Sequence, residues 1–142
     1  MTVHEIIQEF IKKNKYLQDE HVLGILFYGS YKYGLNNQNS DIDLHIIYDD
    51  SNPKHLIRGN TFINGTRIEY FEKTIDEIYN EVEDGYANQD NATESIIGKS
   101  EIIYEKDNSM QDLQAHVLDK FKNGLPHLTE NEAKEQVSII NN

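Results

Sequence analysis

The chain has 142 residues, and its 25 acidic against 13 basic side chains give a net charge of −12 at pH 7. This length is that of one domain with a real hydrophobic core, and the charge disfavours nucleic acid as a partner, because nucleic acid is bound through its phosphates. The chain has no cysteine, which excludes disulfides and thiolate metal sites, and it has no apolar run long enough for a membrane span, so we expect a cytoplasmic protein without a membrane partner.

The first predicted element is an amphipathic helix over residues 2–17. Apolar side chains recur in it at helical spacing, and Thr2 and Glu5 form a capping-box pattern at its start. Two apolar runs then predict strands at Val22–Tyr28 and Ile42–Tyr48.

An Asn64-Gly65 pair between two strand-like runs predicts a β-hairpin, with Thr66–Phe71 as its second strand. The remaining predicted elements are helices over 74–88, 92–97, 109–122 and from 129 onward, and a strand over 101–105. Together these elements indicate an α/β (α+β) fold, with a small mixed β-sheet and helices packed on one side.

The most informative motif joins the first two strands. Gly29 and Ser30 form a turn at the end of the first strand, and Asp41 and Asp43 stand at the start of the second. With a period of two, these aspartates share one face with His45, which is either a structural or a catalytic histidine. Two carboxylates about 7 Å apart along a strand suit hard cations such as Mg²⁺.

The stretch from Gly29 to Leu44 resembles the signature of the DNA polymerase β-like nucleotidyltransferase superfamily, with Gly-Ser, a second glycine at Gly34 and then Ser-Asp-x-Asp. Within that superfamily, the chain looks most like the antibiotic nucleotidyltransferases that act on aminoglycosides and lincosamides. The minimal nucleotidyltransferases of toxin–antitoxin pairs are the nearer rival. Many relatives carry arginine after Gly-Ser, where this chain has Lys32 between two tyrosines.

The resemblance implies that Gly29 and Ser30 bind the phosphates of a nucleoside triphosphate (NTP), with Lys32 as the cation of that turn and Ser40 orienting the loop. Gly29 permits a close approach of phosphate, and Ser30 offers an amide and a hydroxyl at a helix start, although it could also be a plain helix cap. Tyr28 either flanks the nucleobase or the acceptor, or packs structurally.

The resemblance also implies two Mg²⁺ ions held by Asp41, Asp43 and a third carboxylate. Glu69 alternates correctly with its apolar neighbours and matches the third carboxylate of the family, whose implied roles are to bind metal and to deprotonate the acceptor. Two alternatives remain open at this point. Glu72 could be the third acid instead, and Arg67 could simply form a salt bridge with Glu69.

The expected activity is transfer of a nucleoside monophosphate, from ATP, to a hydroxyl of a small molecule such as an aminoglycoside. The acidic chain either attracts such a cationic acceptor or uses its charge only for solubility. The alternative is an antitoxin that binds or AMPylates a partner toxin. A degenerate nucleotide-sensing domain is a third reading, which the intact Asp-x-Asp disfavours.

Residues 1–125 are expected to form the nucleotidyltransferase domain, and residues 126–142 the start of a C-terminal helical region. Ala133, Val137 and Ile140 give that last helix an apolar stripe. We therefore expect a domain cut short that forms a homodimer or binds a partner protein, the alternative being a complete small protein.

Overall fold

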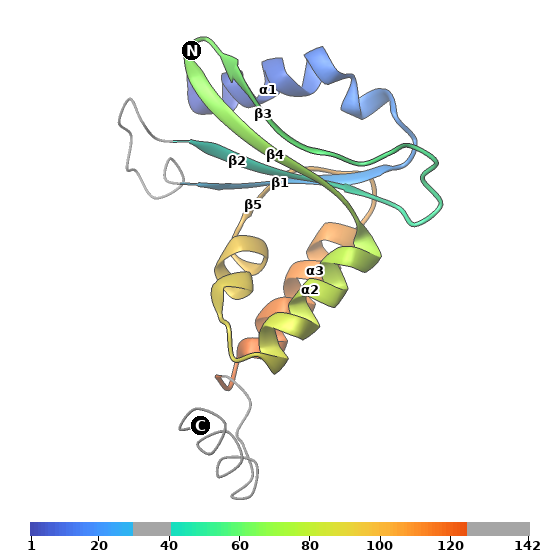
Figure 1. The fold of residues 1–142 in the computed structure, drawn as a ribbon, viewed down its shortest axis with the longest axis vertical. Coiled ribbons are helices and arrows are strands. Elements are labelled where there is room, and N and C mark those ends of the chain that lie inside the picture. The colour runs from blue at the N-terminus through green and yellow to red at the C-terminus, as the bar shows by residue number, and fades with distance from the viewer. Residues whose placement is uncertain (30–40, 125–142) are drawn as a thin grey trace, which may run out of the picture.

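The computed structural model describes residues 1–29 and 41–124, which form a five-stranded sheet between two layers of helices (Figure 1). The strand order is β3-β4-β2-β1-β5. Strands β2 and β4 run parallel and the other neighbouring pairs run antiparallel, which confirms the small mixed sheet expected from the sequence. In chain order the elements are α1 (Val3–Asn14), η1 (Tyr16–Gln18), β1 (Val22–Gly29), β2 (Ile42–Tyr48), β3 (Arg58–Ile63), β4 (Thr66–Thr74), α2 (Ile75–Ala87), the π-helical turn η3 (Glu94–Gly98), β5 (Glu101–Glu105) and α3 (Ser109–Phe121).

Helix α1 covers one face of the sheet, as its amphipathic pattern requires. The predicted capping box is present: the Thr2 hydroxyl accepts from the Glu5 N–H at 3.1 Å, and the Glu5 carboxylate accepts from the Thr2 N–H at 3.0 Å. The helix ends at Asn14 rather than Leu17, because Lys15 adopts a left-handed conformation with φ of 58°.

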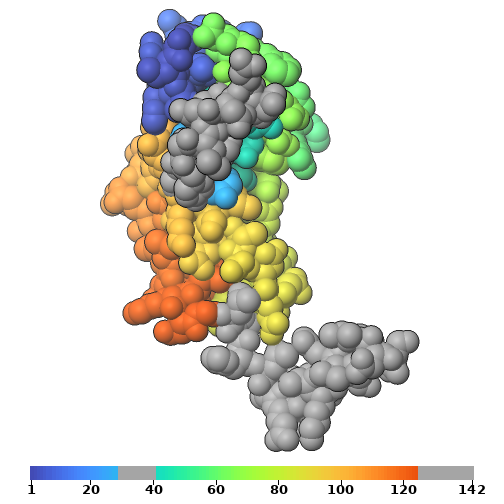
Figure 2. Space-filling model, turned by 90° about the vertical axis from the view of Figure 1, so that its left-hand side faces the viewer, coloured from blue at the N-terminus to red at the C-terminus, as the bar shows by residue number. Residues whose placement is uncertain are grey.

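Helices α2 and α3 and the turn η3 cover the opposite face, so the expectation of helices on one side only is wrong (Figure 1). Figure 2 shows the two layers from another side, with α1 in blue at one end and η3 and α3 in yellow and orange towards the other. Strand β2 gives the reason: Ile46 packs in the core beneath α1, its neighbour Ile47 packs against the other layer, and both are fully buried. A strand that is apolar on both faces has to be covered on both faces.

The predicted hairpin joins β3 to β4. Asn64 and Gly65 have positive φ angles of 51° and 78°, as a two-residue type I′ turn requires. The paired strands extend further than the sequence pattern indicated, back to Arg58 and forward to Thr74. There the Thr74 hydroxyl accepts from the Glu77 N–H at 3.2 Å and starts α2 with the second predicted capping box.

The later elements also follow the sequence pattern. The short helix expected over 92–97 is η3, and the strand and helix expected over 101–105 and 109–122 are β5 and α3. The helix predicted from residue 129 lies outside the described residues. Among the helices of residues 1–29 and 41–124, none has the length and apolar composition needed to cross a membrane.

Candidate active site

The acidic residue of β2, Asp43, faces away from α1. Because side chains alternate along a strand, Asp43 and His45 share the face of Ile47, whereas Leu44 and Ile46 pack beneath α1. The predicted grouping of Asp43 with His45 on one face is therefore confirmed. Asp41 precedes the first residue of the strand.

Glu69 lies beside Asp43. Strands β2 and β4 pair in parallel, with Asp43 opposite Glu69 and His45 opposite Phe71. Glu72 is an odd number of residues further along β4, so its side chain faces α1, where it accepts a hydrogen bond from the Tyr16 hydroxyl at 2.9 Å. Of the two candidate acids, the structure brings only Glu69 to the aspartates.

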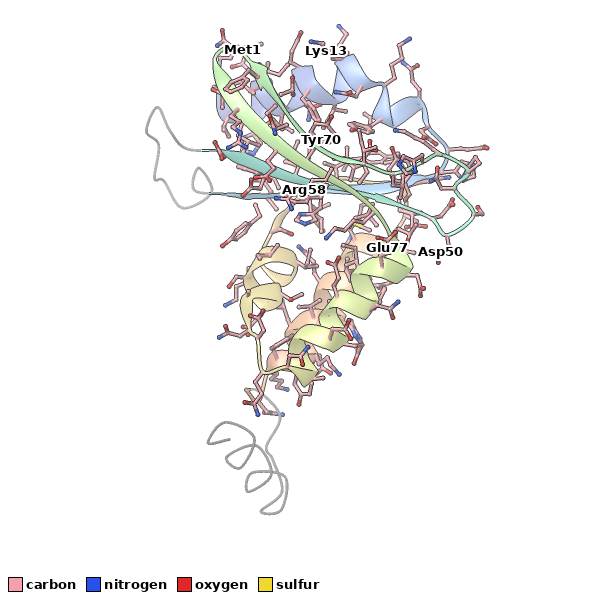
Figure 3. The ribbon with its side chains drawn as sticks, in the orientation of Figure 1. Met1, Lys13, Asp50, Arg58, Tyr70 and Glu77 are labelled. Carbon is pink, nitrogen blue, oxygen red and sulfur yellow. The ribbon has the colours of Figure 1, made fainter. Side chains whose placement is uncertain are left out.

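Both arginines of the chain pair with these carboxylates. Arg67 Nη1 donates to Asp41 Oδ2 at 3.1 Å, and Arg58 Nη2 donates to Glu69 Oε1 at 2.7 Å. The alternative in which Arg67 pairs with Glu69 is therefore not the one observed, because Arg67 lies two residues earlier on β4, level with Asp41. Figure 3 labels Arg58 near the sheet, below Tyr70, which packs on the α1 side.

Sequence reasoning missed Arg58, although the hairpin held the signal. A two-residue turn at Asn64-Gly65 fixes the register, so that Arg58 lies opposite Phe71 and diagonal to Glu69. Long side chains reach such diagonal neighbours. The guanidinium of Arg58 accordingly lies 4.7 Å from the centre of the Phe71 ring on its way to Glu69.

The ionised form of Asp43 is disfavoured in this cluster. Its burial, together with repulsion from Glu69 and Asp41, raises its pKa from 3.8 to about 6, against the opposing effect of Arg67 and Arg58. Within the described part of the chain, no three acidic or histidine side chains converge closely enough to hold a metal as they stand, and the two arginines instead hold Asp41 and Glu69. The donors still suit Mg²⁺, because they are hard oxygen ligands whose mutual repulsion a cation would relieve.

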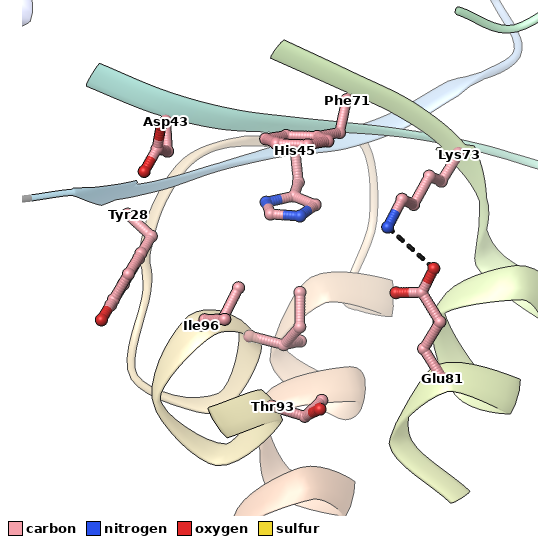
Figure 4. A pocket seen from close by; sticks show the side chains of 9 residues that line it. Tyr28, Asp43, His45, Phe71, Lys73, Glu81, Thr93 and Ile96 are labelled. Atoms are coloured by element: carbon pink, nitrogen blue, oxygen red, sulfur yellow. Dashed lines mark hydrogen bonds and ion pairs between the residues drawn. The ribbon is translucent and has the colours of Figure 1, made fainter. Parts of the chain in front are cut away.

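A pocket of about 280 Å³ extends from Asp43 along the underside of the sheet (Figure 4). Its lining residues are Tyr28, Asp43, His45, Phe71, Lys73, Glu81, Thr93, Ile96 and Ile97. The His45 ring stacks on Phe71 with centroids 4.9 Å apart, and its burial, with the nearby charge of Lys73, lowers its pKa from 6.5 to about 4. His45 is therefore a neutral imidazole at physiological pH.

The predicted phosphate turn begins where β1 ends. Gly29 is the last residue of β1 and lies opposite Ile42, and the preceding Tyr28 lies opposite Asp43 and lines the pocket. Ser30, Lys32 and Ser40 lie outside the described residues. The end of β1 and Asp43 at the start of β2 are thus neighbours, as the motif requires.

Comparison with known proteins agrees with this geometry. The family model for the nucleotidyltransferase domain matches residues 5–123. Among solved structures, the chain is similar to a nucleotidyltransferase-like protein from Exiguobacterium sibiricum, with a TM-score of 0.61 and 14% sequence identity, over 82% of this chain and 38% of that chain. The chain thus spans well under half of that relative, and the likeness shows the fold alone.

No curated protein matches the chain. The family model supports the superfamily resemblance drawn from the Gly-Ser and Asp-x-Asp pattern, without any specific antibiotic branch. The matched residues include most of α1, all five strands and α3, and therefore every strand that positions Asp41, Asp43 and Glu69. The chain belongs to the nucleotidyltransferase domain family.

Proposed function

We propose that this domain transfers a nucleoside monophosphate from a magnesium-bound NTP, with ATP as the donor, to a hydroxyl group of a small molecule, and releases pyrophosphate. The observation that carries the proposal is the register of β2 and β4, which sets Asp43 beside Glu69 with Asp41 at the same end of the sheet. Nucleotidyl transfer needs closely spaced carboxylates of this kind.

Asp41, Asp43 and Glu69 would hold two Mg²⁺ ions. When bound, the metal supplies positive charge beside the phosphates and the attacking and leaving oxygens. The protein residues fix where that charge stands, because two strands of one sheet carry them. Gly29 and Ser30, with Lys32 and Ser40 in the following loop, are proposed to bind the triphosphate.

Glu69 is the proposed general base. The oxygen of the acceptor hydroxyl forms a bond to the α-phosphorus, its proton passes to the Glu69 carboxylate, and the bond from the α-phosphorus to the β-phosphate oxygen breaks to release pyrophosphate. Glu69 suits this role because its side chain is 21% exposed and has a single arginine partner among the described interactions.

A small cationic acceptor, such as an aminoglycoside, is the proposed class of substrate. Two observations support it: the net charge of −12, and the likeness of the sequence motif to antibiotic nucleotidyltransferases. A strongly acidic chain attracts cations by long-range electrostatics and repels nucleic acid.

The test is Mg²⁺-dependent release of pyrophosphate from ATP with a panel of hydroxyl acceptors. Asp41→Asn and Asp43→Asn should each lower the rate by more than about 10²-fold, because each removes the negative charge of a proposed metal ligand without changing side-chain size. Asp119→Asn, on the exposed side of α3, is the control and should keep full activity. Circular dichroism checks the fold, and activity within a few-fold of wild type in both site variants would refute the metal assignment.

A further inference from the structure

The pocket beside Asp43 is a chamber between two layers of the fold. Strands β1, β2 and β4 supply its roof through Tyr28, His45 and Phe71, and η3 supplies its floor through Ile96 and Ile97. Figure 4 shows the imidazole of His45 between Phe71 and Ile96. A flat group that entered from the side of Asp43 would therefore meet an aromatic roof and an aliphatic floor.

The polar atoms of this chamber are not all satisfied. His45 is only 6% exposed, and its Nδ1 has no hydrogen-bond partner in the part of the chain that the structure describes. Buried polar atoms in folded proteins nearly always have a partner, so the unpaired ring nitrogen of His45 needs an explanation, and a ligand in the adjoining chamber would supply one. One face of the imidazole is already occupied by Phe71, with an interplanar angle of 15°.

Two of the three charged residues that line the chamber are paired with each other. Lys73 Nζ and Glu81 Oε1 lie 2.7 Å apart at the end away from Asp43 (Figure 4). Asp43 is the other charged lining residue, and its proposed partner is a metal ion at the mouth. Apart from Asp43 at its mouth, the chamber therefore offers no unpaired charge to an ionic ligand, and its apolar walls would disfavour one.

We propose that this chamber binds a flat, uncharged ring of the substrate, which stacks between His45 and Ile96 and makes a hydrogen bond to the imidazole of His45. The inference rests on the proposed function, because it places the rest of the substrate at Asp43. The ring belongs to the nucleoside of the NTP or to the acceptor alcohol, and binding measurements separate these two sources. His45 is thus a substrate-binding residue, and the acceptor's cationic groups lie outside the chamber.

The experiment follows the imidazole ¹⁵N signals of His45 in histidine-labelled protein, assigned by their loss in His45→Phe. The probes are adenosine, guanosine, cytidine and uridine for the donor's ring, and phenol for a ring alcohol. We expect at least one probe to shift the His45 signals saturably. A response to nucleosides would show that the ring in the chamber is the base of the donor, and a response to phenol alone would show that it belongs to the acceptor.

Two variants locate the binding. Ile96→Trp fills the chamber and should weaken the responding probe at least tenfold, whereas Leu17→Trp, at an exposed site on η1, should not. His45→Phe keeps the stacking surface but removes both ring nitrogens, and calorimetry should show weaker binding of the same probe. Thermal unfolding confirms that each variant is folded.

The outcome for the chamber is separable from the outcome for the proposed function. Inorganic tripolyphosphate with Mg²⁺ binds through charge alone, so Ile96→Trp should leave its affinity unchanged. If the wild-type protein does not bind tripolyphosphate with Mg²⁺, that result would count against the proposed nucleotidyl transfer site. The ring proposal is overturned if no uncharged probe shifts His45, or if Ile96→Trp leaves the response intact.

Discussion

Glu69 and Glu72 lie three residues apart on the same strand and have opposite environments. Glu72 faces α1, and its side chain is 2% exposed. Its carboxylate accepts hydrogen bonds from the Tyr16 hydroxyl at 2.9 Å, Lys54 Nζ at 3.2 Å, the Ile57 N–H at 3.2 Å and the Tyr48 hydroxyl at 3.5 Å. Glu69 faces the other side, is 21% exposed, and its carboxylate pairs with Arg58.

The difference separates a structural acid from one available for chemistry. The partners of Glu72 come from η1, β2 and the segment before β3, so this carboxylate ties distant parts of the chain together. A carboxylate with so many partners has no oxygen free for a metal or a proton. Glu69 can exchange a single exposed arginine for a metal at small cost, because exposed ion pairs contribute little.

The largest expected effect on stability comes from the α1 face. Glu72→Ala should lower the free energy of unfolding by about 3 kcal/mol, because it leaves two tyrosine hydroxyls and a lysine without their acceptor. Glu101→Ala, which removes only the exposed pair with His4, is the control and should cost less than about 1 kcal/mol. Urea unfolding measures both, and a loss at Glu72 no greater than the control would remove the contrast between the faces.

On the opposite face, the effect should fall on turnover rather than stability. Glu69→Gln keeps an oxygen ligand but cannot accept a proton, so we expect turnover to fall by about 10²-fold, with Mg²⁺–ATP binding retained and no rise of rate with pH. Urea unfolding should give wild-type stability to within about 0.5 kcal/mol. Full turnover with an unaltered pH profile would assign the base to another group.

Asp43 should destabilise the metal-free protein. Its raised pKa means that the folded state binds the Asp43 proton more tightly than the unfolded state does. Protonated Asp43 therefore contributes stability below pH 3.8, and this contribution is lost as pH rises through about 6. Asp43→Asn should therefore be more stable than wild type at pH 7 in EDTA, by about 1 kcal/mol, and not at pH 4. Thermal unfolding at the two pH values tests this. Equal stability of both proteins at pH 7 would show that the carboxylates do not repel.

The smallest expected effect is a change in Mg²⁺ affinity when either arginine is replaced. Arg58→Gln and Arg67→Gln each remove a cation that competes with Mg²⁺ for a carboxylate, so we expect the free protein to bind Mg²⁺ a few-fold more tightly. Lys73→Gln is the matched control, because Lys73 pairs with Glu81 instead. Calorimetric titration measures the affinity. Weaker Mg²⁺ binding in the arginine variants would mean that these side chains orient the carboxylates for the metal.

The sequence by itself determined the local elements and named Asp41 and Asp43 as the first two candidate acids. Capping boxes at Thr2 and Thr74, the turn at Asn64-Gly65 and the alternation around Asp43 depend only on neighbours a few residues away, so they are readable without a fold. The local elements predicted the mixed sheet, and the Gly-Ser and Asp-x-Asp motif gave the resemblance to the nucleotidyltransferase superfamily.

Only the tertiary structure decided which strands are neighbours and what covers them. The parallel pairing of β4 with β2 places Glu69, and not Glu72, beside Asp43, and it brings Arg67 to Asp41. The second helical layer creates the chamber around His45. Strand order and layer packing depend on contacts between residues far apart in the chain, and a periodic pattern shows which face a residue occupies but not what that face meets.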